Sequence, residues 1–288
     1  MMNFPAYRKL PLCLLATLLI ASCTERIDIE LDSTYTRLVV QGAVTSDSVR
    51  HRVLLTTSSD YFSNMSSPQV SGAVVKISFD NQTYTLVENT FYPGLYETPE
   101  AFRGVIGTTY ELHISQVDVD KDGQSEEYHA ESTMAGGAEL EYIALRYFST
   151  PIVTGYQVLM WARHLPEQRD WFGYRIRKNG VMLTDSLSTY TTFSDDLFDD
   201  GYLPGLPVGF LSDDDPRQKV NPGDIVTFEL ESIDQAYYDF VNDAQLELIG
   251  NIPLFSGPPA NIRSNISNGG LGIFAAYSIL RASTILEP

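Results

Sequence analysis

Three clusters of acidic residues carry the side chains that could do chemistry in this sequence. The first, Asp118-Val119-Asp120-Lys121-Asp122-Gly123, begins like a calcium-binding loop, because hard cations prefer carboxylate oxygens at such alternate positions. The twelfth position of that pattern is His129, where calcium loops place a bidentate glutamate. Asp-Gly between two expected strands is also ordinary hairpin chemistry. We therefore predict a turn at Asp118, Asp120 and Asp122, with calcium binding as the alternative.

The second cluster combines carboxylates with aromatic rings in a segment, 191–209, that we expect to be a loop. Such a loop could bind a sugar or a cationic peptide, and a solvated loop without a ligand is the competing interpretation. Asp213–Asp215 forms the third cluster. The candidate residues for ligand or partner contact in the second cluster are Phe193, Asp195, Asp196, Phe198, Asp199 and Tyr202.

A third candidate contact region, 258–272, is rich in asparagine and glycine. Asparagine side chains can bond their own backbone, and glycine permits positive φ angles. We predict a tightly built, self-bonded loop that leads into the last strand, and a purely structural crossover is the alternative. Its candidate contact residues are Asn261, Asn265 and Asn268.

The sequence lacks the short motifs of common hydrolases and nucleotide-binding enzymes. Its four histidines, at 51, 113, 129 and 164, show neither H-E-x-x-H nor H-x-x-x-H spacing, so zinc hydrolase chemistry lacks its usual trace. Neither G-x-S-x-G nor G-x-x-x-x-G-K-[ST] occurs. Carboxylate pairs leave glycosidase chemistry open, although no pair stands out as acid and base. We predict no catalytic residue and no cofactor apart from the calcium alternative, and we favour binding over enzymatic activity.

Composition narrows the class of partner. The chain has 37 acidic and 19 basic residues, a formal net charge of −18 at pH 7. Nucleic acid and anionic lipid headgroups are poor partners for such a surface. The only cysteines are Cys13 and Cys23. If Cys13 is lost with a signal peptide and Cys23 is acylated, no disulfide or thiolate metal site remains.

The first 22 residues have the pattern of a bacterial lipoprotein signal peptide. Arg8 and Lys9 precede the apolar run Leu10–Ile20, which is too short to span a bilayer. It ends in Ile20-Ala21-Ser22-Cys23, a lipobox, so cleavage before Cys23 would place acyl chains on that residue. We predict a signal peptide over 1–22 and an acylated tether over 23–36. A plain signal peptide with a chance cysteine is the alternative.

The elements that would position the candidate residues are mostly strands. From residue 37 the chain has short runs rich in Val, Ile, Thr and Tyr, separated by turn residues about every 8–12 positions, as in a β-sandwich or barrel. Apolar residues alternate within these runs, as expected for strands with one buried face. We predict an immunoglobulin-like β-sandwich over 37–135. Its expected strands are 38–44, 52–57, 73–79, 84–86 and 110–114.

A second β domain, 138–288, is expected after the glycine pair at 136–137. Asn179-Gly180 is a hairpin turn signal. Apolar residues recur at helical spacing over 233–249, and Ser232 with Gln235 has the spacing of a capping box. The predicted fold class is therefore all-β, with two sandwich-like domains and one amphipathic helix in the second. The expected strands of this domain are 142–148, 157–162, 171–177, 181–184, 225–230 and 272–279.

Residues 258–274 read P-P-x-N-I-x-S-N-I-x-x-G-G-L-G-x-F, which resembles the closing signature of the DUF4249 lipoproteins of Bacteroidetes. Leu38-Val39-Val40-Gln41-Gly42 and Ser71-Gly72-Ala73-Val74-Val75 are similar to other parts of that family. The resemblance implies an outer-membrane lipoprotein with an N-terminal immunoglobulin-like or carboxypeptidase-regulatory-like domain, often encoded beside TonB-dependent receptors. It implies no catalytic residues. One departure is 251–257, where an acidic residue usually precedes the paired prolines.

The resemblance and the signal pattern together predict a function in the outer membrane. We expect a lipid-anchored protein, facing the cell surface rather than the periplasm, that binds a small ligand and acts as a non-catalytic accessory subunit of a TonB-dependent barrel. Its role would be nutrient or metallophore uptake. A surface glycan or peptide hydrolase is one alternative, and an adhesin or envelope structural protein is another.

Overall fold

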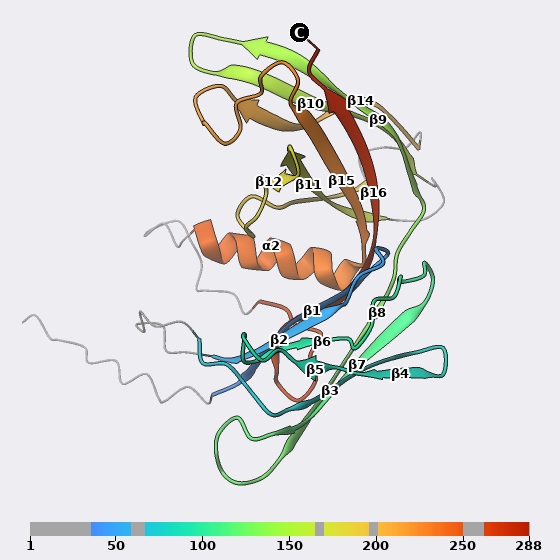
Figure 1. The fold of residues 1–288 in the computed structure, drawn as a ribbon, viewed down its shortest axis with the longest axis vertical. Helices are drawn as coiled ribbons and strands as arrows, with labels where there is room; N and C mark the ends of the chain where they lie inside the picture. The colour runs from blue at the N-terminus through green and yellow to red at the C-terminus, as the bar shows by residue number, and fades with distance from the viewer. Residues whose placement is uncertain (1–35, 59–66, 165–169, 196–200, 250–261, 288) are drawn as a thin grey trace, which may run out of the picture. The chain divides into compact units, whose positions relative to one another are not determined.

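The computed structural model describes residues 36–58, 67–164, 170–195, 201–249 and 262–287. The predicted signal peptide, the acylation of Cys23 and the tether before residue 36 lie outside these residues. The candidate contacts Asp196, Phe198, Asp199 and Asn261 also lie outside them. The described part of the chain is mostly strand and has one helix, which confirms the predicted all-β class (Figure 1).

The first eight strands form a sandwich of two sheet regions. One region contains β1, β2, β5 and β6, and the other is a separate four-stranded sheet in the order β4-β3-β7-β8. Alternate residues of both regions face inward, for example Val40 and Val53 from one and Ile77 and Ile114 from the other, and all four are fully buried. The bounds are β1 Leu38–Thr45, β2 Arg52–Thr57, β3 Val74–Phe79, β4 Gln82–Thr85, β5 Val87–Glu88, β6 Leu95–Glu97, β7 Thr109–Val117 and β8 Glu126–Thr133.

The remaining strands enclose a second core. β9, β10 and β14 form a three-stranded sheet whose buried residues, such as Val158 and Met160, join Phe172 and Phe228 from β11 and β15 in one cluster. The bounds are β9 Ala138–Ser149, β10 Thr154–His164, β11 Trp171–Lys178, β12 Val181–Met182, β13 Thr191–Ser194, β14 Tyr202–Ser212, β15 Ile225–Ile233 and β16 Leu271–Ile285.

A single nine-stranded sheet runs through both halves of the chain, in the order β12-β11-β15-β16-β1-β2-β6-β5 with β13 beside β11. β16 pairs with β1 in parallel and with β15 antiparallel. Its residues Phe274 and Ala276 belong to the first core, whereas Leu280 and Ala282 pack against the second. One face of β16 thus serves two cores. The division into domains at 135–138 stays a prediction.

The segment 191–209, expected to be a loop, contains strand β13 and the first part of β14. The loop prediction was wrong because β14 carries Pro204, Pro207 and two glycines, which argue against a strand. β14 is an edge strand, and its pairing with β10 shifts register beside both prolines. Proline is tolerated at such an edge, because one side of the strand needs no ladder hydrogen bond.

Helix α2 spans Gln235–Ile249, two residues shorter at its start than predicted. The predicted capping box was wrong, because Ser232 is a buried residue of β15. The cap is Asp234, whose Oδ1 accepts the backbone N–H of Tyr237 at 2.8 Å. The helix packs against β11, β13 and β16 (Figure 1). Within the described residues, no helix is long and apolar enough to cross a membrane.

The variant Gly272→Ala tests how much the parallel pairing of β1 with β16 contributes to stability. Gly272 is in register with Val40 and has a φ of +89°, and a Cβ added to it would collide with the carbonyl oxygen of Val40. We expect Gly272→Ala to lower the free energy of unfolding by about 2–5 kcal/mol, since left-handed strain adds to overpacking. Urea unfolding followed by circular dichroism measures this.

Gly223→Ala is the matched control, because Gly223 has a φ of +90° but no atom within 4 Å of an added Cβ. This variant should cost only the backbone strain, about 1–2 kcal/mol. Equal losses in the two variants would show that the close approach of β16 to β1 contributes nothing.

Candidate functional site

A groove of about 590 Å³ lies on the face of the nine-stranded sheet that points away from the first core. Successive residues of a strand face opposite sides of the sheet, so Val39, Gln41 and Ala43 of β1 line the groove while Val40 and Val44 are buried. Leu54 of β2, paired with Gln41, continues the same surface.

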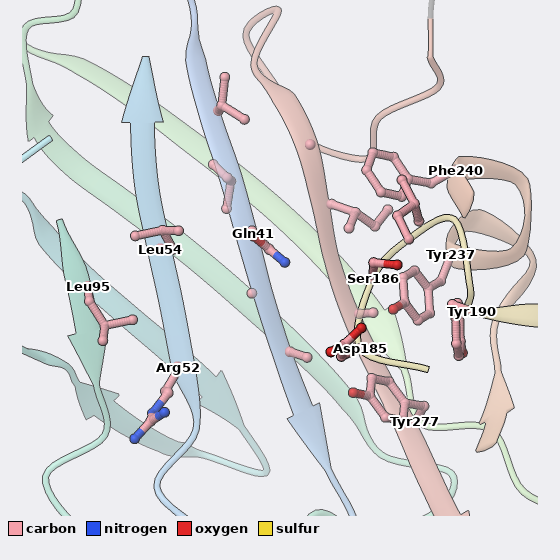
Figure 2. Close-up of a pocket in the computed structure, with 18 of the residues that line it drawn as sticks. Gln41, Arg52, Leu54, Leu95, Asp185, Ser186, Tyr190, Tyr237, Phe240 and Tyr277 are labelled. Atoms are coloured by element: carbon pink, nitrogen blue, oxygen red, sulfur yellow. The ribbon is translucent and has the colours of Figure 1, made fainter. Parts of the chain in front are cut away.

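The opposite wall comes from α2 and from the segment 185–190 that precedes β13. Figure 2 shows Asp185, Ser186 and Tyr190 on this side, together with Tyr237 and Phe240 of the helix. Asp185 accepts a hydrogen bond from Arg217 at 2.8 Å, and this bond holds the pKa of the Asp185 carboxyl below its usual value.

A buried ion pair supports the floor of the groove. Glu231 of β15 is 1% exposed, and its two oxygens accept hydrogen bonds from Arg175 Nε at 2.9 Å and from the Tyr190 hydroxyl at 2.6 Å. Arg175 also lies over the Tyr190 ring, 4.3 Å from its centroid. Burial raises the pKa of Glu231, and Arg175 and Tyr190 oppose that shift. The carboxylate is therefore satisfied by partners within the fold.

Three tyrosine rings stack from the α2 wall of the groove to the sheet. The centroids of Tyr190 and Tyr237 are 6.1 Å apart, and those of Tyr237 and Tyr277 are 5.8 Å apart with 18° between the ring planes. Burial, followed by the charge of Glu231, raises the pKa of Tyr237 to about 12. Gly173 leaves the space that Tyr190 occupies, since an added Cβ would collide with the tyrosine hydroxyl. The stack is thus held from below by the sheet.

A second buried carboxylate extends this network along the sheet. Glu229, two residues before Glu231, accepts hydrogen bonds from Arg177 and Arg281, each at 2.8 Å. Arg281 also donates hydrogen bonds from both of its terminal nitrogens to the two carboxylate oxygens of Asp47. Each carboxylate faces a guanidinium, so this face is charged but locally compensated. Such a network fixes side chains in place rather than offering a free acid or base.

The arrangement suits binding of a small organic molecule. A volume of 590 Å³ falls within the range of about 300–1,000 Å³ that is usual for ligand sites. The walls are largely aliphatic and aromatic, and Gln41 and Ser186 place polar groups within the groove. Apolar walls with a few fixed polar groups are the ordinary composition of a ligand pocket.

The candidate residues of 193–202 that the structure describes do not line this groove. Phe193 of β13 packs on Phe172, with ring centroids 5.3 Å apart, and belongs to the second core. Asp195 is 8% exposed, and Tyr202 begins β14 beneath the guanidinium of Arg163. Ligand contact by these residues stays a prediction.

Asn265 acts as a structural bridge in the loop before β16. Its side-chain oxygen accepts the N–H of Phe274 at 3.0 Å, and its amide nitrogen donates to the carbonyls of Phe274 and Glu131. Asn265 therefore bonds strands β8 and β16 rather than its own loop, and the self-bonded loop stays a prediction. Asn268 is exposed with a φ of 55°, as a left-handed turn position requires.

The carboxylates of Asp118, Asp120 and Asp122 have ligand oxygens within 4.8 Å of one another. Asp118 accepts hydrogen bonds from the N–H groups of Asp122 and Gly123, and Asp122 accepts one from Gln124. These bonds close the turn between β7 and β8, so each carboxylate has a structural role without a cation. Calcium binding stays an alternative.

A sequence model of the family described as "Domain of unknown function (DUF4249)" matches residues 24–283. The chain belongs to the DUF4249 family. No curated protein matches this DUF4249 chain. Among solved structures, it is similar to a DUF4785 family protein from Legionella pneumophila, with 10% identity and a TM-score of 0.26. The match covers 70% of this chain and 54% of that one, so the DUF4249 chain spans about half the length of that structure.

The sequence contains a pattern that predicts the buried network of arginines and glutamates, although the search for short motifs did not reveal it. Charged residues alternate with a single apolar residue in Arg175-Ile176-Arg177 and again in Glu229-Leu230-Glu231. Opposite charges at the same spacing in two strands indicate strands that pair side by side. β11 and β15 do pair, with Arg175 in register with Glu229.

Arg175→Met tests whether the ion pair beneath the groove is structural. The change leaves Glu231 buried without its cation, so we expect the free energy of unfolding to fall by about 3–5 kcal/mol. Urea unfolding at neutral pH measures the loss.

The matched control is Arg217→Met, which breaks the exposed pair with Asp185, whose side chains are 58% and 50% exposed. That variant should lose less than about 1 kcal/mol. A similarly small loss for Arg175→Met would contradict a structural role for the buried pair.

Proposed function

We propose that this DUF4249 chain is a lipid-anchored binding protein of the outer membrane that captures a small organic ligand for a TonB-dependent receptor. The observation that carries the proposal is the groove with its stacked tyrosines and apolar walls. The role is non-catalytic, and the ligand is a nutrient or a metallophore. The membrane anchor and the receptor rest on the lipobox at Cys23 and on the family resemblance.

The aliphatic and aromatic walls of the groove favour a ligand with a flat or ring-shaped apolar face. Sugar rings and aromatic groups both pack on aromatic side chains, and Gln41 can bond a polar edge of either. The buried ion pair fixes Tyr190, so binding costs less ordering of the site. This preorganisation favours capture over a role as a structural spacer.

Exposed apolar residues at the turn between β9 and β10 support contact with a partner protein. Ile152 is 89% exposed, and Tyr147, Phe148 and Val153 near it are also exposed. Exposed apolar residues that gather at one turn are typical of interaction sites. We assign this turn, rather than the groove, to contact with the receptor barrel.

Gln41→Arg tests the groove as the ligand site. The purified full chain in detergent is screened by thermal shift against maltodextrins, short peptides and ferric catecholates, and binding of any compound found is measured by calorimetry. A longer, charged side chain in the centre of the groove should weaken that binding by at least about tenfold, which is a loss of about 1.4 kcal/mol.

Gln82→Arg is the control, because Gln82 is an exposed residue of β4 on the other sheet and receives the same change. Binding should be unchanged in this variant. A ligand whose affinity is the same in both variants would place the binding site elsewhere, and a screen without any bound compound would reject the capture role.

The receptor part of the proposal is tested by a pull-down of the tagged full chain from native outer membranes in mild detergent. We expect a TonB-dependent barrel in near-stoichiometric amount, and Ile152→Asp should reduce its recovery, since a charge in an apolar interface is costly to bury. Gln82→Arg should leave recovery unchanged. Recovery of the chain without a barrel would reject the accessory role while leaving ligand binding intact.

A further inference from the structure

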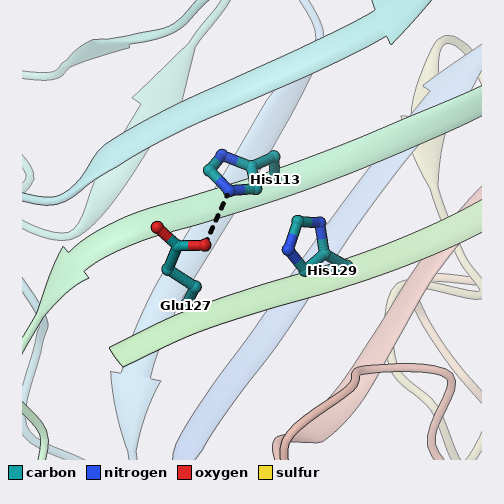
Figure 3. Close-up of side chains that lie close together, drawn as sticks. All are labelled: His113, Glu127 and His129. Atoms are coloured by element: carbon teal, nitrogen blue, oxygen red, sulfur yellow. Dashed lines mark ion pairs between the residues drawn. The ribbon is translucent and has the colours of Figure 1, made fainter. Parts of the chain in front are cut away.

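The hairpin of β7 and β8 places two histidines directly opposite each other on the outer face of the four-stranded sheet. His113 and His129 are cross-strand partners, and their ring centroids are 4.5 Å apart (Figure 3). Glu127, two residues before His129 on the same face, points toward them, with its Oε2 3.6 Å from His113 Nε2. The three side chains therefore converge from one hairpin.

The local backbone explains the convergence. Both backbone groups of His129 point away from β7. Its N–H donates to Ser267 Oγ at 2.7 Å, and its carbonyl accepts the N–H of Ser267 at 2.8 Å. His113 and His129 are thus a non-hydrogen-bonded pair, the type in which side chains of an antiparallel ladder approach most closely. This bridge to the loop before β16 holds the edge strand, and His129 with it, in place.

The opposite face of the same hairpin fixes the strands from below. Leu112, Ile114, Tyr128 and Ala130 alternate with the two histidines and are buried in the first core. The Cα positions beneath the histidines therefore belong to a packed sheet rather than to a loop. Because the backbone is fixed, only the side chains need to rotate for the three ligand atoms to reach one metal ion.

The donor atoms suit a transition metal. One ligand atom from each of His113, Glu127 and His129 lies within 4.8 Å of the others. Tetrahedral zinc, with bonds of about 2.0–2.1 Å, needs donors about 3.3 Å apart. The Glu127 side chain is 65% exposed and free to move that far. Within the described residues, the imidazole nitrogens of the two histidines make no hydrogen bond that metal binding would break.

The surrounding charges favour a bound cation on balance. Glu111 and Glu131 are direct cross-strand partners one step along the same face, and like charges so placed repel each other. Lys76 of β3 is in register with His113 and acts in the opposite direction. With Glu127 included, three carboxylates and one ammonium group flank the two imidazoles, so a divalent ion relieves more repulsion than it adds.

We propose that His113, Glu127 and His129 form a binding site for zinc or a similar divalent transition metal. Two imidazoles and one carboxylate are a usual three-residue zinc set, which leaves one coordination position open to water or to an external ligand. Calcium is disfavoured, because it takes oxygen ligands. The site lies on the outer face of one sheet of the first sandwich and the groove on the outer face of the other, so the two are separate.

The sequence held a signal for this site. A hairpin that turns at Asp120–Gly123 and pairs Ile114 with Tyr128 must also pair the residues beside them, His113 and His129. H-x-x-x-H spacing does not reveal such a pair, because that spacing belongs to helices.

Zinc binding by the chelator-treated full chain in detergent tests the proposal. We expect calorimetry to show one tight zinc ion per chain, and cobalt substitution to give the visible absorption of a four-coordinate site. His113→Ala and His129→Ala should each weaken zinc binding by at least about tenfold, since even partners of metal ligands contribute that much. The unfolding midpoint of each metal-free variant, compared with that of the unmodified chain, shows whether the fold is retained.

Three control variants distinguish this site from the acidic turn, the groove and a general effect of surface charge. Glu131→Gln removes a neighbouring charge but no ligand, Asp120→Asn alters the acidic turn, and Gln41→Arg alters the groove. Each should retain zinc within about threefold, a difference of less than about 1 kcal/mol. Absence of stoichiometric zinc, or binding that survives both histidine variants, would overturn the proposal. Loss of zinc in Asp120→Asn alone would assign the metal to the turn.

Discussion

The parallel pairing of β1 with β16 is the constraint on which the rest of the structure depends. It joins a strand near residue 40 to one near residue 272. Gly272 leaves room for the Val40 backbone, and Gly42 leaves room for the side chains of Val53 and Phe274. Through it, one sheet serves both cores, and its outer face becomes the floor of the groove. The tyrosine stack exists because Tyr277 of β16 is brought beside Tyr237 of the helix.

Local patterns predicted the parts of the fold that local physics determines. Alternation over 110–114 predicted a strand, now part of β7, because the strand has one buried face. Asn179-Gly180 predicted a turn, and both residues have positive φ. The helix was predicted from its spacing, but its cap was not. Asp234 could be recognised as the cap only once β15 was known to include Ser232, because a residue inside a strand cannot begin a helix.

The groove could not be predicted, because its walls come from segments far apart in the chain. Gln41, Arg175, Tyr237 and Tyr277 become neighbours only through the strand order of the sheet, and no local pattern specifies that order. Two of the residues predicted for ligand contact, Asn265 and Phe193, make structural contacts. Asn265 replaces a strand partner for Phe274, and Phe193 fills the second core.

The long separation in sequence between β1 and β16 has a consequence for folding. Until residues 271–285 pair, β1 has β2 on one side only, and its other edge presents unsatisfied backbone groups. The first sandwich also lacks Phe274 and Ala276 from its core during that interval. Contacts of such long sequence separation form slowly. The open edge of β1 and the first core are therefore completed only once residues 271–285 are available to pair.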